Sequence, residues 1–533
     1  MKTRSLLLSA LVLINVWSAC EVLTTKSACA RAARGSGRRT SSAHASNPAA
    51  RPAQTKFDMP ITNAVNAWLK RYELRNSQVA VEVMDFATGN VVCSSQGEKR
   101  FTPASTAKVF STACAFESYG GNYRYTTAIA CSGAIKDGKI KGDLYLIPSE
   151  DPTLSYGDLM RLFSELSNKG IKSVDGSLKL SPTPSGGDHF VPSFLNEDFG
   201  QEWMPVSSDL VVDSNIFGGG NLPNNAKLLE IDSTQEFNAH SKSIMRQDLY
   251  PGWMVYDDKT NTVRAYRGYP VATGRGPLVV SNPNMFNLAL ARTAAKNAGI
   301  KFGGKNSDAG KELNLSVLVE HKSEPLSKII QTCLHQSDNL YAQQLLRTIA
   351  LGSDNKSNDH PSMEEKGLAR LRGWLGSFGV PMNEVVLKDG CGLSRKDCVT
   401  PHALNMVLRH MLSKYGEGGY VSLLKGGDVK HGQKSGSWKF KTGAMDSVRC
   451  ITGVLKNSGG QTLLVTIMVN GHAPGVGDVR TSIGALVSTL AGTQMQAPKE
   501  PKPEVKVETK TVTTKTETKT QSTLETKEAK PHN

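Results

Sequence analysis

The spacing of hydrophobic residues predicts a helix near the start of the folded region, followed by a β-hairpin. Apolar side chains follow a helical period over residues 61–74, and residues 79–86 and 91–92 are extended runs around a turn at 87–90. Helical periodicity returns in the second half of the chain, at residues 285–298, 326–334, 340–349 and 481–490. This order of elements indicates a domain that mixes helices with a sheet.

Residues 123–282 interrupt that pattern. Their apolar runs are short and are broken by Gly, Pro, Asn and Asp, as in residues 142–147 and 177–180, which is typical of β-rich structure. We therefore expect a β-rich insertion over 123–282, with a catalytic domain split into residues 57–122 and 283–493.

The two ends of the chain differ in composition from the middle. Residues 1–30 begin with a charged Met1-Lys2-Thr3-Arg4-Ser5 and an apolar run too short for a membrane span, which predicts an export signal. Cys20 raises the alternative of a lipid anchor, but Trp17 stands where a lipid-attachment signal usually has an aliphatic residue. We expect export to the periplasm or cell envelope, with lipidation less favoured.

Residues 31–56 and 497–533 lack apolar periodicity and are expected to be a disordered lead-in and a disordered Lys/Glu/Thr tail. The ends also carry most of the charge: subtracting +8 for residues 1–56 and +2 for 497–533 from the total of +15 leaves about +5 for the middle. A nucleic-acid partner is therefore not expected. Weak association with a membrane or wall polymer remains an alternative to a tail that is only a spacer.

The nine cysteines form no metal-binding pattern, and no His-Glu-x-x-His stretch occurs, so we expect neither a metal nor another cofactor. Cys391 and Cys398 are spaced for a local disulfide, and two free thiols are the alternative.

Three short motifs carry the candidate chemistry. In the first, Ser105-Thr106-Ala107-Lys108, the hydroxyl and the amine are three residues apart on a predicted helix and so share one face. A serine hydroxyl is a poor nucleophile until a base removes its proton, and a partly desolvated Lys108 is a candidate base. Because a Ser-x-x-Lys pair is common by chance, it needs the other two motifs for support.

The other two motifs each have a competitor in the sequence. Ser337-Asp338-Asn339 lies between helical segments, whereas the same letters at Ser353-Asp354-Asn355 lie in a polar stretch typical of a solvated loop. Lys441-Thr442-Gly443 ends an extended run and is preferred over Lys434-Ser435-Gly436. A lysine and a hydroxyl on a strand edge can hold a substrate carboxylate.

With these motifs in this order, the chain resembles the low-molecular-mass D-alanyl-D-alanine carboxypeptidases of the serine penicillin-binding proteins, peptidase family S13, in the branch with a large insertion after the first motif. The resemblance covers roughly residues 57–493 and includes Gly142-Asp143-Leu144, Asp151-Pro152-Thr153-Leu154 and residues 389–395. It implies a transpeptidase-like domain in which helices flank an antiparallel sheet.

The resemblance also implies catalytic roles for three of these residues. Ser105 would be the nucleophile, Lys108 its base, and Ser337 a proton relay toward the leaving amine. The backbone N–H groups of Ser105 and Ala444 would form the oxyanion hole.

The same resemblance implies the groups that bind substrate. Asn339 would contact the substrate amide, Lys441 and Thr442 would bind the terminal carboxylate, and Gly443 would also belong to the substrate-binding residues. Two departures leave the shape of the insertion and the chemistry beside the cleft open: residues 148–150 replace a glycine run, and Cys391 stands where the family has Ser.

The implied function is an exported serine D-Ala-D-Ala carboxypeptidase acting on peptidoglycan stem peptides through an acyl-enzyme, with an additional DD-endopeptidase activity as an open question. β-Lactam antibiotics would be covalent inhibitors. A wall-binding scaffold without turnover and a β-lactamase-like hydrolase are the alternatives. An α/β-hydrolase esterase is disfavoured because no Gly-x-Ser-x-Gly elbow occurs.

Overall fold

The computed structural model describes residues 58–496, except 182–190, 196–197, 199–202, 218–226, 232–253, 258–261, 267–277, 280–282, 306, 309–313, 352–361 and 474–477. The predicted export signal, lead-in and tail, Cys20 and the Ser353 triplet therefore lie outside the described residues.

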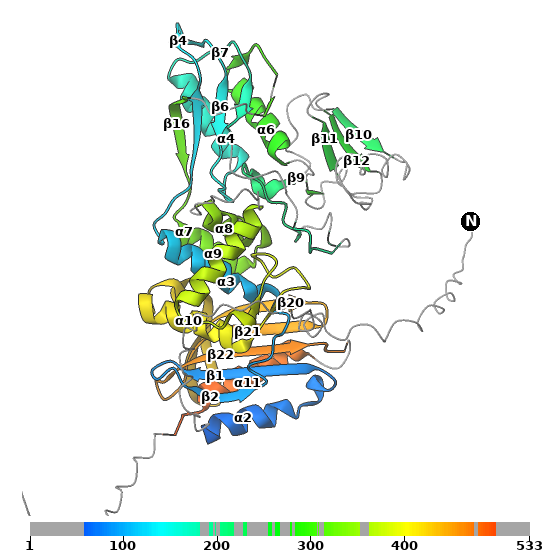
Figure 1. The fold of residues 1–533 in the computed structure, drawn as a ribbon, viewed down its shortest axis with the longest axis vertical. Helices are drawn as coiled ribbons and strands as arrows, with labels where there is room; N and C mark the ends of the chain where they lie inside the picture. The colour runs from blue at the N-terminus through cyan, green and yellow to red at the C-terminus, as the bar shows by residue number, and fades with distance from the viewer. Residues whose placement is uncertain are drawn as a thin grey trace, which may run out of the picture. The chain divides into compact units, whose positions relative to one another are not determined.

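An antiparallel sheet forms the centre of the catalytic domain (Figure 1). Within the described residues its six strands have the order β19-β20-β21-β22-β1-β2, so the N-terminal hairpin lies beside the C-terminal strands. Their bounds are β19 Lys425–His431, β20 Lys434–Met445, β21 Val448–Lys456, β22 Thr462–Asn470, β1 Gln78–Asp85 and β2 Val91–Ser95. The predicted hairpin is confirmed, and Val81 pairs with both Ser95 and Ile467.

Helices cover both faces of this sheet. On one face, α2 (Met59–Leu69) and α11 (Val479–Gly492) bury an apolar layer that includes Ile61 and Leu486. The other face packs against a helical layer, in which α10 contacts β1, β21 and β22 and α3 packs against α8. The helices of this layer are α3 Lys108–Tyr119, α7 Leu326–Gln336, α8 Asn339–Leu351, α9 Met363–Ser377 and α10 Pro401–Tyr415.

Two helices of this layer had no counterpart in the prediction. Helix α9 begins with a capping box between Ser362 and Glu365, and α10 begins after Thr400, whose side chain accepts a hydrogen bond from the Ala403 N–H. Between them, short strands β17 (Val385–Val386) and β18 (Cys398–Val399) pair with each other. The turn that contains residues 389–394 is therefore held between two packed helices.

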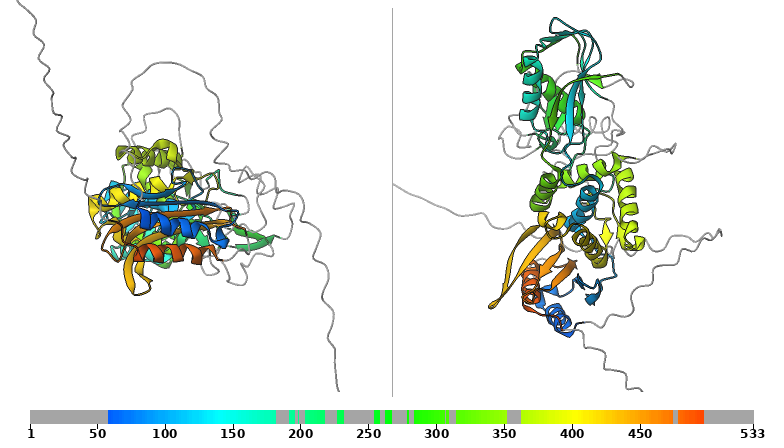
Figure 2. Two further views of the ribbon diagram at one scale, coloured as in Figure 1. Left: turned by 90° about the horizontal axis from the view of Figure 1, so that it is seen from below. Right: turned by 90° about the vertical axis from the view of Figure 1, so that its left-hand side faces the viewer.

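The insertion carries the predicted strands and has an apolar core of its own. In the ribbon views its helices and strands lie apart from the six-stranded sheet (Figure 2). Its sheets are built from β3 Thr126–Cys131, β4 Ile135–Lys136, β5 Lys139–Ile140, β6 Leu144–Ile147, β7 Ser173–Val174, β8 Leu178–Leu180, β14 Lys301–Phe302, β15 Ser307–Asp308 and β16 Ser316–Lys322. Further strands are β9 Ile216–Phe217, β10 Lys227–Ile231, β11 Met254–Asp257, β12 Thr262–Tyr266 and β13 Leu278–Val279. Two helices, α4 (Tyr156–Asn168) and α6 (Pro283–Asn297), pack against these sheets.

The insertion extends further along the chain than the sequence pattern predicted. Helix α6 shares the apolar core of the insertion, and β16 pairs with β3 from Ser316↔Cys131 to Lys322↔Thr126. The predicted boundary after residue 282 therefore separates α6 and β16 from the elements they pack against. We propose a boundary near residue 323, because helical periodicity alone did not show which core α6 joins.

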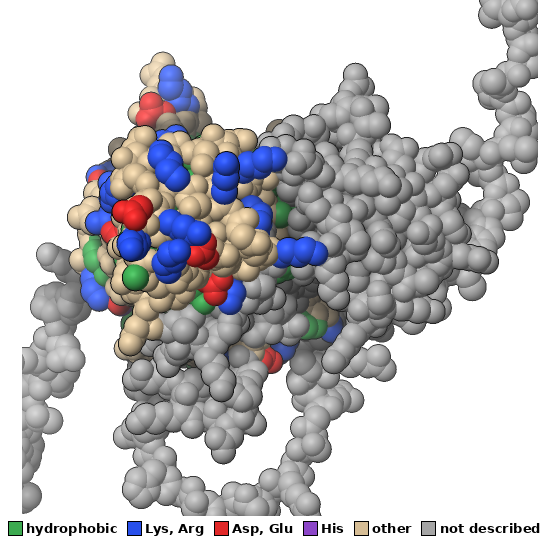
Figure 3. Space-filling model, turned by 90° about the horizontal axis from the view of Figure 1, so that it is seen from above, with side chains coloured by type: hydrophobic (Ala, Val, Ile, Leu, Met, Phe, Trp, Pro, Cys, Tyr) green, Lys and Arg blue, Asp and Glu red, His purple; other side chains and the backbone are tan. Residues whose placement is uncertain are grey.

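Seen from above, the insertion presents many Lys and Arg side chains to solvent (Figure 3). Several lysines of the insertion are paired with acids: Asp175 contacts both Lys139 and Lys141, and Glu165 contacts Lys169. No helix in the described part of the chain is long and apolar enough to span a membrane.

Candidate active site

The first motif lies where a 3₁₀-turn runs into a buried helix. Turn η2 (Ala104–Ala107) carries a half-buried Ser105, and α3 begins at Lys108, whose side chain is completely buried. Ala104 has a φ of 48°, a left-handed conformation that L-residues rarely adopt. Gly392 packs so closely on the Ala104 carbonyl oxygen that a Cβ on residue 392 would collide with this oxygen. The backbone that presents Ser105 is thus held by the turn beside it.

Lys108 makes three polar contacts that suit a base. Its Nζ lies 3.0 Å from Ser105 Oγ, 2.6 Å from Asn339 Oδ1 and 2.8 Å from the Cys391 carbonyl oxygen. Because the amide and carbonyl oxygens only accept hydrogen bonds, they use two N–H groups of the amine. In a neutral lysine the remaining position is a lone pair directed at the Ser105 hydroxyl, which is the geometry needed to remove its proton.

The second motif joins two helices. Ser337 follows α7 in the left-handed conformation, with φ 60° and ψ 34°, and Asn339 begins α8. Asp338 lies between them and accepts a hydrogen bond from the Tyr341 N–H at 2.9 Å, while burial raises the pKa of its carboxyl. The left-handed residue turns the chain sharply, so that Ser337 and Asn339 contact different lysines.

The third motif lies on β20. Lys441 is 2% exposed, and its Nζ donates to Ser337 Oγ at 2.9 Å and to the Thr442 carbonyl oxygen at 2.7 Å. A Cβ at Gly443 would lie 2.6 Å from the Pro103 oxygen and 3.1 Å from the Ser105 nitrogen. Only glycine lets this strand pass so close to the backbone of the candidate nucleophile.

The end of β20 is open on one side. Its ladder with β19 starts at Lys425↔Phe440, whereas its ladder with β21 continues to Met445↔Val448. Among the described strands, none pairs with Thr442–Ala444 on the β19 side. This edge of the strand is therefore open to a ligand that adds in the manner of a further strand.

The charge of Lys108 acts on the second buried lysine of the site, Lys441. Burial, together with the positive charge of Lys108, lowers the pKa of Lys441 from 10.5 to about 7. An anion bound beside Lys441 would reverse this effect, so the site favours a ligand with a carboxylate.

Cys391 contributes its backbone to the site. Its carbonyl accepts a hydrogen bond from Lys108, and Asp389 holds the turn by accepting from the N–H groups of Cys391, Gly392 and Ser394. Cys391 and Cys398 are two buried thiols with no disulfide between them, so the bridge considered from their spacing is not formed. Burial raises the pKa of the Cys391 thiol, which favours a space-filling role over redox reactivity.

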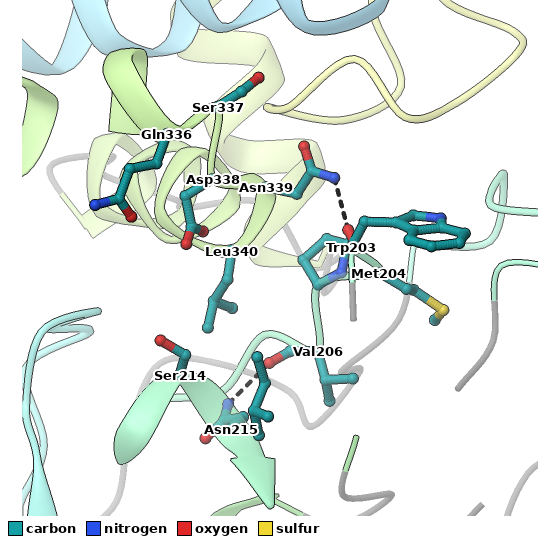
Figure 4. A pocket seen from close by; sticks show the side chains of 12 residues that line it. Trp203, Met204, Val206, Ser214, Asn215, Gln336, Ser337, Asp338, Asn339 and Leu340 are labelled. Carbon is teal, nitrogen blue, oxygen red and sulfur yellow. Dashed lines mark hydrogen bonds between the residues drawn. The ribbon is translucent and has the colours of Figure 1, made fainter. Parts of the chain in front are cut away.

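All three motifs therefore meet at one place, and sequence reasoning missed some of their neighbours. Asn339 Nδ2 donates to the Trp203 carbonyl oxygen of the insertion at 2.6 Å, which leaves its second N–H for substrate (Figure 4). Nothing in the sequence pattern around Trp203 pointed to this contact. The competing Lys434 lies at the other end of β20 and donates to the Gly492 carbonyl oxygen, away from the site.

A second missed cluster anchors the insertion to α8. Arg347 is 2% exposed and pairs with Glu150 at 2.8 Å, Asp209 at 3.0 Å and Glu364 at 3.1 Å. Gln344 donates to Glu150 and to the Ser208 carbonyl oxygen. Because Asn339 begins the same helix, this cluster and the Trp203 contact hold one segment of the insertion against the site.

Two pockets in the described part of the chain share Ser337. One, of about 280 Å³, lies between residues 336–340 and the insertion residues 203–206 and 214–216 (Figure 4). The other, of about 630 Å³, contains Lys441–Ala444 and extends between β19, β20 and α11. Ser337 thus borders two spaces that can each hold part of a substrate.

Comparison with known proteins gives a consistent result. A family model described as "D-Ala-D-Ala carboxypeptidase 3 (S13) family" matches residues 61–491. The D-alanyl-D-alanine carboxypeptidase DacB of Haemophilus influenzae is 23% identical over 448 residues, covering 77% of this chain and 89% of that protein. The D-alanyl-D-alanine carboxypeptidase of Actinomadura sp. strain R39 is 25% identical over 464 residues, covering 81% of this chain and 85% of that protein.

Solved structures show the same fold. The crystal structure of penicillin-binding protein 4 from Haemophilus influenzae superposes with a TM-score of 0.62 at 21% identity, covering 80% of this chain and 98% of that one. The same protein complexed with a β-lactam superposes with a TM-score of 0.59. The predicted fold, a sheet flanked by helices in a penicillin-binding-protein arrangement, is confirmed.

Proposed function

This chain belongs to the D-Ala-D-Ala carboxypeptidase 3 (S13) family, and from that premise we propose that its three motifs form one serine acyl-transfer site. The substrate would be a peptidoglycan stem peptide ending in D-Ala-D-Ala, and the product the released terminal D-Ala. The observation that carries the proposal is the position of Lys108 Nζ, which joins Ser105 Oγ and Asn339 Oδ1.

The first half of the reaction follows from this geometry. Lys108 removes the hydroxyl proton while Ser105 Oγ attacks the carbonyl carbon between the two D-Ala residues. The N–H groups of Ser105 and Ala444 stabilise the negative oxygen, and the fit of Gly443 against the Ser105 nitrogen supports their closeness. One such donor typically contributes about 3 kcal/mol in the transition state.

In the second half of the reaction, the enzyme releases D-Ala and then the shortened stem peptide. Ser337, hydrogen-bonded to Lys441, relays to the leaving amine the proton that Lys108 took from Ser105, as the C–N bond breaks. Lys441 and Thr442 hold the terminal carboxylate, and the second N–H of Asn339 binds the substrate amide. Water then hydrolyses the ester on Ser105 and regenerates the enzyme.

The proposed function is tested by time-resolved release of D-Ala from a pentapeptide ending in D-Ala-D-Ala, followed by mass analysis after incubation with penicillin. We expect turnover of the peptide and a lasting penicilloyl adduct on the protein. An adduct without D-Ala release would favour a penicillin-binding scaffold, and rapid loss of the adduct would favour a β-lactamase. Export to the periplasm or cell envelope belongs to the same proposal, and the mature mass from the native host checks it.

The lowered pKa of Lys441 predicts a pH dependence that is specific to the carboxylate. As pH rises through about 7, free Lys441 loses its proton, so the enzyme loses a positive charge that the substrate carboxylate needs. We expect kcat/KM for the D-Ala-D-Ala acid, divided by that for the matching carboxamide, to fall above pH 7 by up to about tenfold per unit.

Taking this ratio cancels the pH dependence of the shared acylation chemistry, including that of its base. A Lys441→Gln variant, which cannot titrate, serves as the control and should show a constant ratio. A wild-type ratio that stays flat between pH 6 and 9 would contradict the carboxylate role of Lys441.

A further inference from the structure

A row of buried polar side chains crosses the six-stranded sheet and ends at Lys441. Lys441 of β20 pairs with Thr452 of β21, which pairs with Thr466 of β22. Thr466 in turn pairs with Glu82 of β1. Because residues directly opposite one another on an antiparallel sheet share a face, these side chains lie side by side. Thr452 and Thr466 are completely buried, and Glu82 is 2% exposed.

The neighbouring rows on the same face are apolar. They belong to the core between the sheet and the helical layer, and consist of Ala80, Met468 and Cys450 on one side and of Met84, Leu464 and Val454 on the other. Burying hydroxyl, amide and carboxyl groups among such residues costs free energy unless each group finds a partner. The partners of the buried polar groups are therefore the feature to explain.

The hydrogen bonds along the row run in one direction. Asn405 of α10 donates through Nδ2 to the backbone carbonyl of Glu82 at 3.2 Å and to its Oε1 at 3.1 Å. Because a carbonyl only accepts, Asn405 Oδ1 must face the other way, where it accepts from Thr466 Oγ1 at 2.7 Å. The single proton of Thr466 is then used, so Thr452 donates in the 2.7 Å contact between the two hydroxyls. We call Glu82, Asn405, Thr466 and Thr452 the polar row.

This direction matters for Lys441. Since Thr452 donates its only proton to Thr466, its hydroxyl offers only lone pairs to Lys441, whose Cβ in such a cross-strand pair lies about 5 Å away. Lys441 Nζ already donates to Ser337 Oγ and to the Thr442 carbonyl oxygen. A charged amine has a third N–H that a neutral amine lacks, so an acceptor beside it favours the charged form.

We propose that Thr452 is a positioning residue for Lys441: the polar row fixes its hydroxyl as an acceptor beside the lysine and so favours the ammonium form. The use of that ammonium to hold a substrate carboxylate rests on the proposed function, whereas the effect on the charge of Lys441 does not. The hydroxyl opposes burial and the charge of Lys108, which together lower the pKa of Lys441 to about 7. Without the hydroxyl, this pKa is expected to be lower still.

Other ionisable groups face the two ends of the polar row. Those that act on Lys441 are Lys108 of α3, Cys333 of α7 and Lys425 of β19. Those near Glu82 are His402 of α10, whose Nδ1 lies 3.1 Å from Glu82 Oε1, and Cys93 of β2. Burial raises the pKa of the Cys333 thiol, so it stays neutral near pH 7. All these groups are kept when Thr452 is replaced, so a difference between variants reports its hydroxyl.

The test follows the titration of Lys441 directly, by NMR of protein carrying ¹³C at the lysine Cε, with the resonance assigned by its loss in Lys441→Gln. Thr452→Val keeps the shape of the side chain and should lower the titration midpoint by about half a pH unit or more. Thr466→Val should lower it in the same direction, because Thr452 then has no fixed acceptor for its proton. Thr452→Ser, which keeps a hydroxyl, should retain the wild-type midpoint.

A kinetic readout accompanies the NMR midpoint. The ratio of kcat/KM for the D-Ala-D-Ala acid to that for the carboxamide reports charged Lys441, so it should fall at lower pH in Thr452→Val. At pH 8 we expect this ratio to be about threefold below that of the wild type. Val454→Ala is the matched control, since Val454 is a buried residue of β21 on the same face. It should lower thermal stability and leave the midpoint unchanged.

The outcomes separate this proposal from the proposed function. A wild-type midpoint in Thr452→Val, or an equal displacement in Val454→Ala, would show that the polar row only stabilises the fold, and D-Ala release would still support the carboxypeptidase. If the wild type releases no D-Ala, the proposed function fails, and the NMR midpoints still decide whether Thr452 acts on Lys441. A lowered midpoint in both valine variants, retained in Thr452→Ser and Val454→Ala, supports the positioning role.

Discussion

Replacing Ser105 by alanine is expected to abolish D-Ala release, with a loss in kcat of about 10⁶-fold, and to prevent formation of the penicilloyl adduct. The reason is chemical: the acyl-enzyme needs the Ser105 oxygen, and no other hydroxyl contacts Lys108 Nζ among the bonds of the described residues. D-Ala release and intact mass after penicillin treatment measure the two effects on one preparation.

The matched control is Ser353→Ala, which alters the serine of the repeated Ser-Asp-Asn triplet. It should leave both D-Ala release and adduct formation at wild-type levels. Because Ser105 is half-buried and small, its replacement should also leave thermal stability nearly unchanged, which separates lost chemistry from lost folding. A penicilloyl adduct on Ser105→Ala protein would show that another residue is the nucleophile.

Local patterns made the motifs predictable before the structure was known. The three-residue spacing of Ser105 and Lys108 is a property of one helical turn, and the helical segments around Ser337 follow from periodicity alone. Local patterns did not predict that the three motifs come together in space. That expectation depended on the resemblance to a family. The structure supports it through two bonds that span long sequence distances, Lys108 to Asn339 and Lys441 to Ser337.

The contacts of the insertion could not be predicted because they are not local. The Trp203 carbonyl meets Asn339 across 136 residues, and backbone carbonyls leave no trace in a residue pattern. Glu150 gave a partial signal, since it stands where the family has a glycine run. In the structure Glu150 has a left-handed φ of 65°, a conformation that suits glycine. Its side chain forms a buried ion pair with Arg347.

The Arg347 cluster connects the insertion to the catalytic helices through charge. Three carboxylates, from Glu150, Asp209 and Glu364, face one guanidinium, and all four groups are largely removed from water. Burial and the neighbouring Asp209 raise the pKa of Glu150 to about 7 despite the pairing with Arg347. The cluster therefore has an excess of negative charge at high pH, and Arg347 is the cation in it that offsets this excess.

Replacing Arg347 by methionine is therefore expected to lower the free energy of unfolding by about 3–5 kcal/mol, since it leaves buried carboxylates without their cation. Arg372→Met, which removes an exposed arginine of α9, should change it by less than about 0.5 kcal/mol. Denaturant unfolding at constant ionic strength measures both variants.

The pH dependence of this loss tests its cause. A carboxyl whose folded pKa lies above its unfolded value stabilises the fold at low pH, and that stability is lost as pH rises through the folded pKa. For Glu150 the window runs from about 4.5 to 7 in the wild type, and without Arg347 its upper limit should move higher. The cost of Arg347→Met should accordingly be larger at pH 8 than at pH 6. An equal cost at both values would indicate lost packing of the long side chain, in place of an uncompensated charge between the insertion and α8.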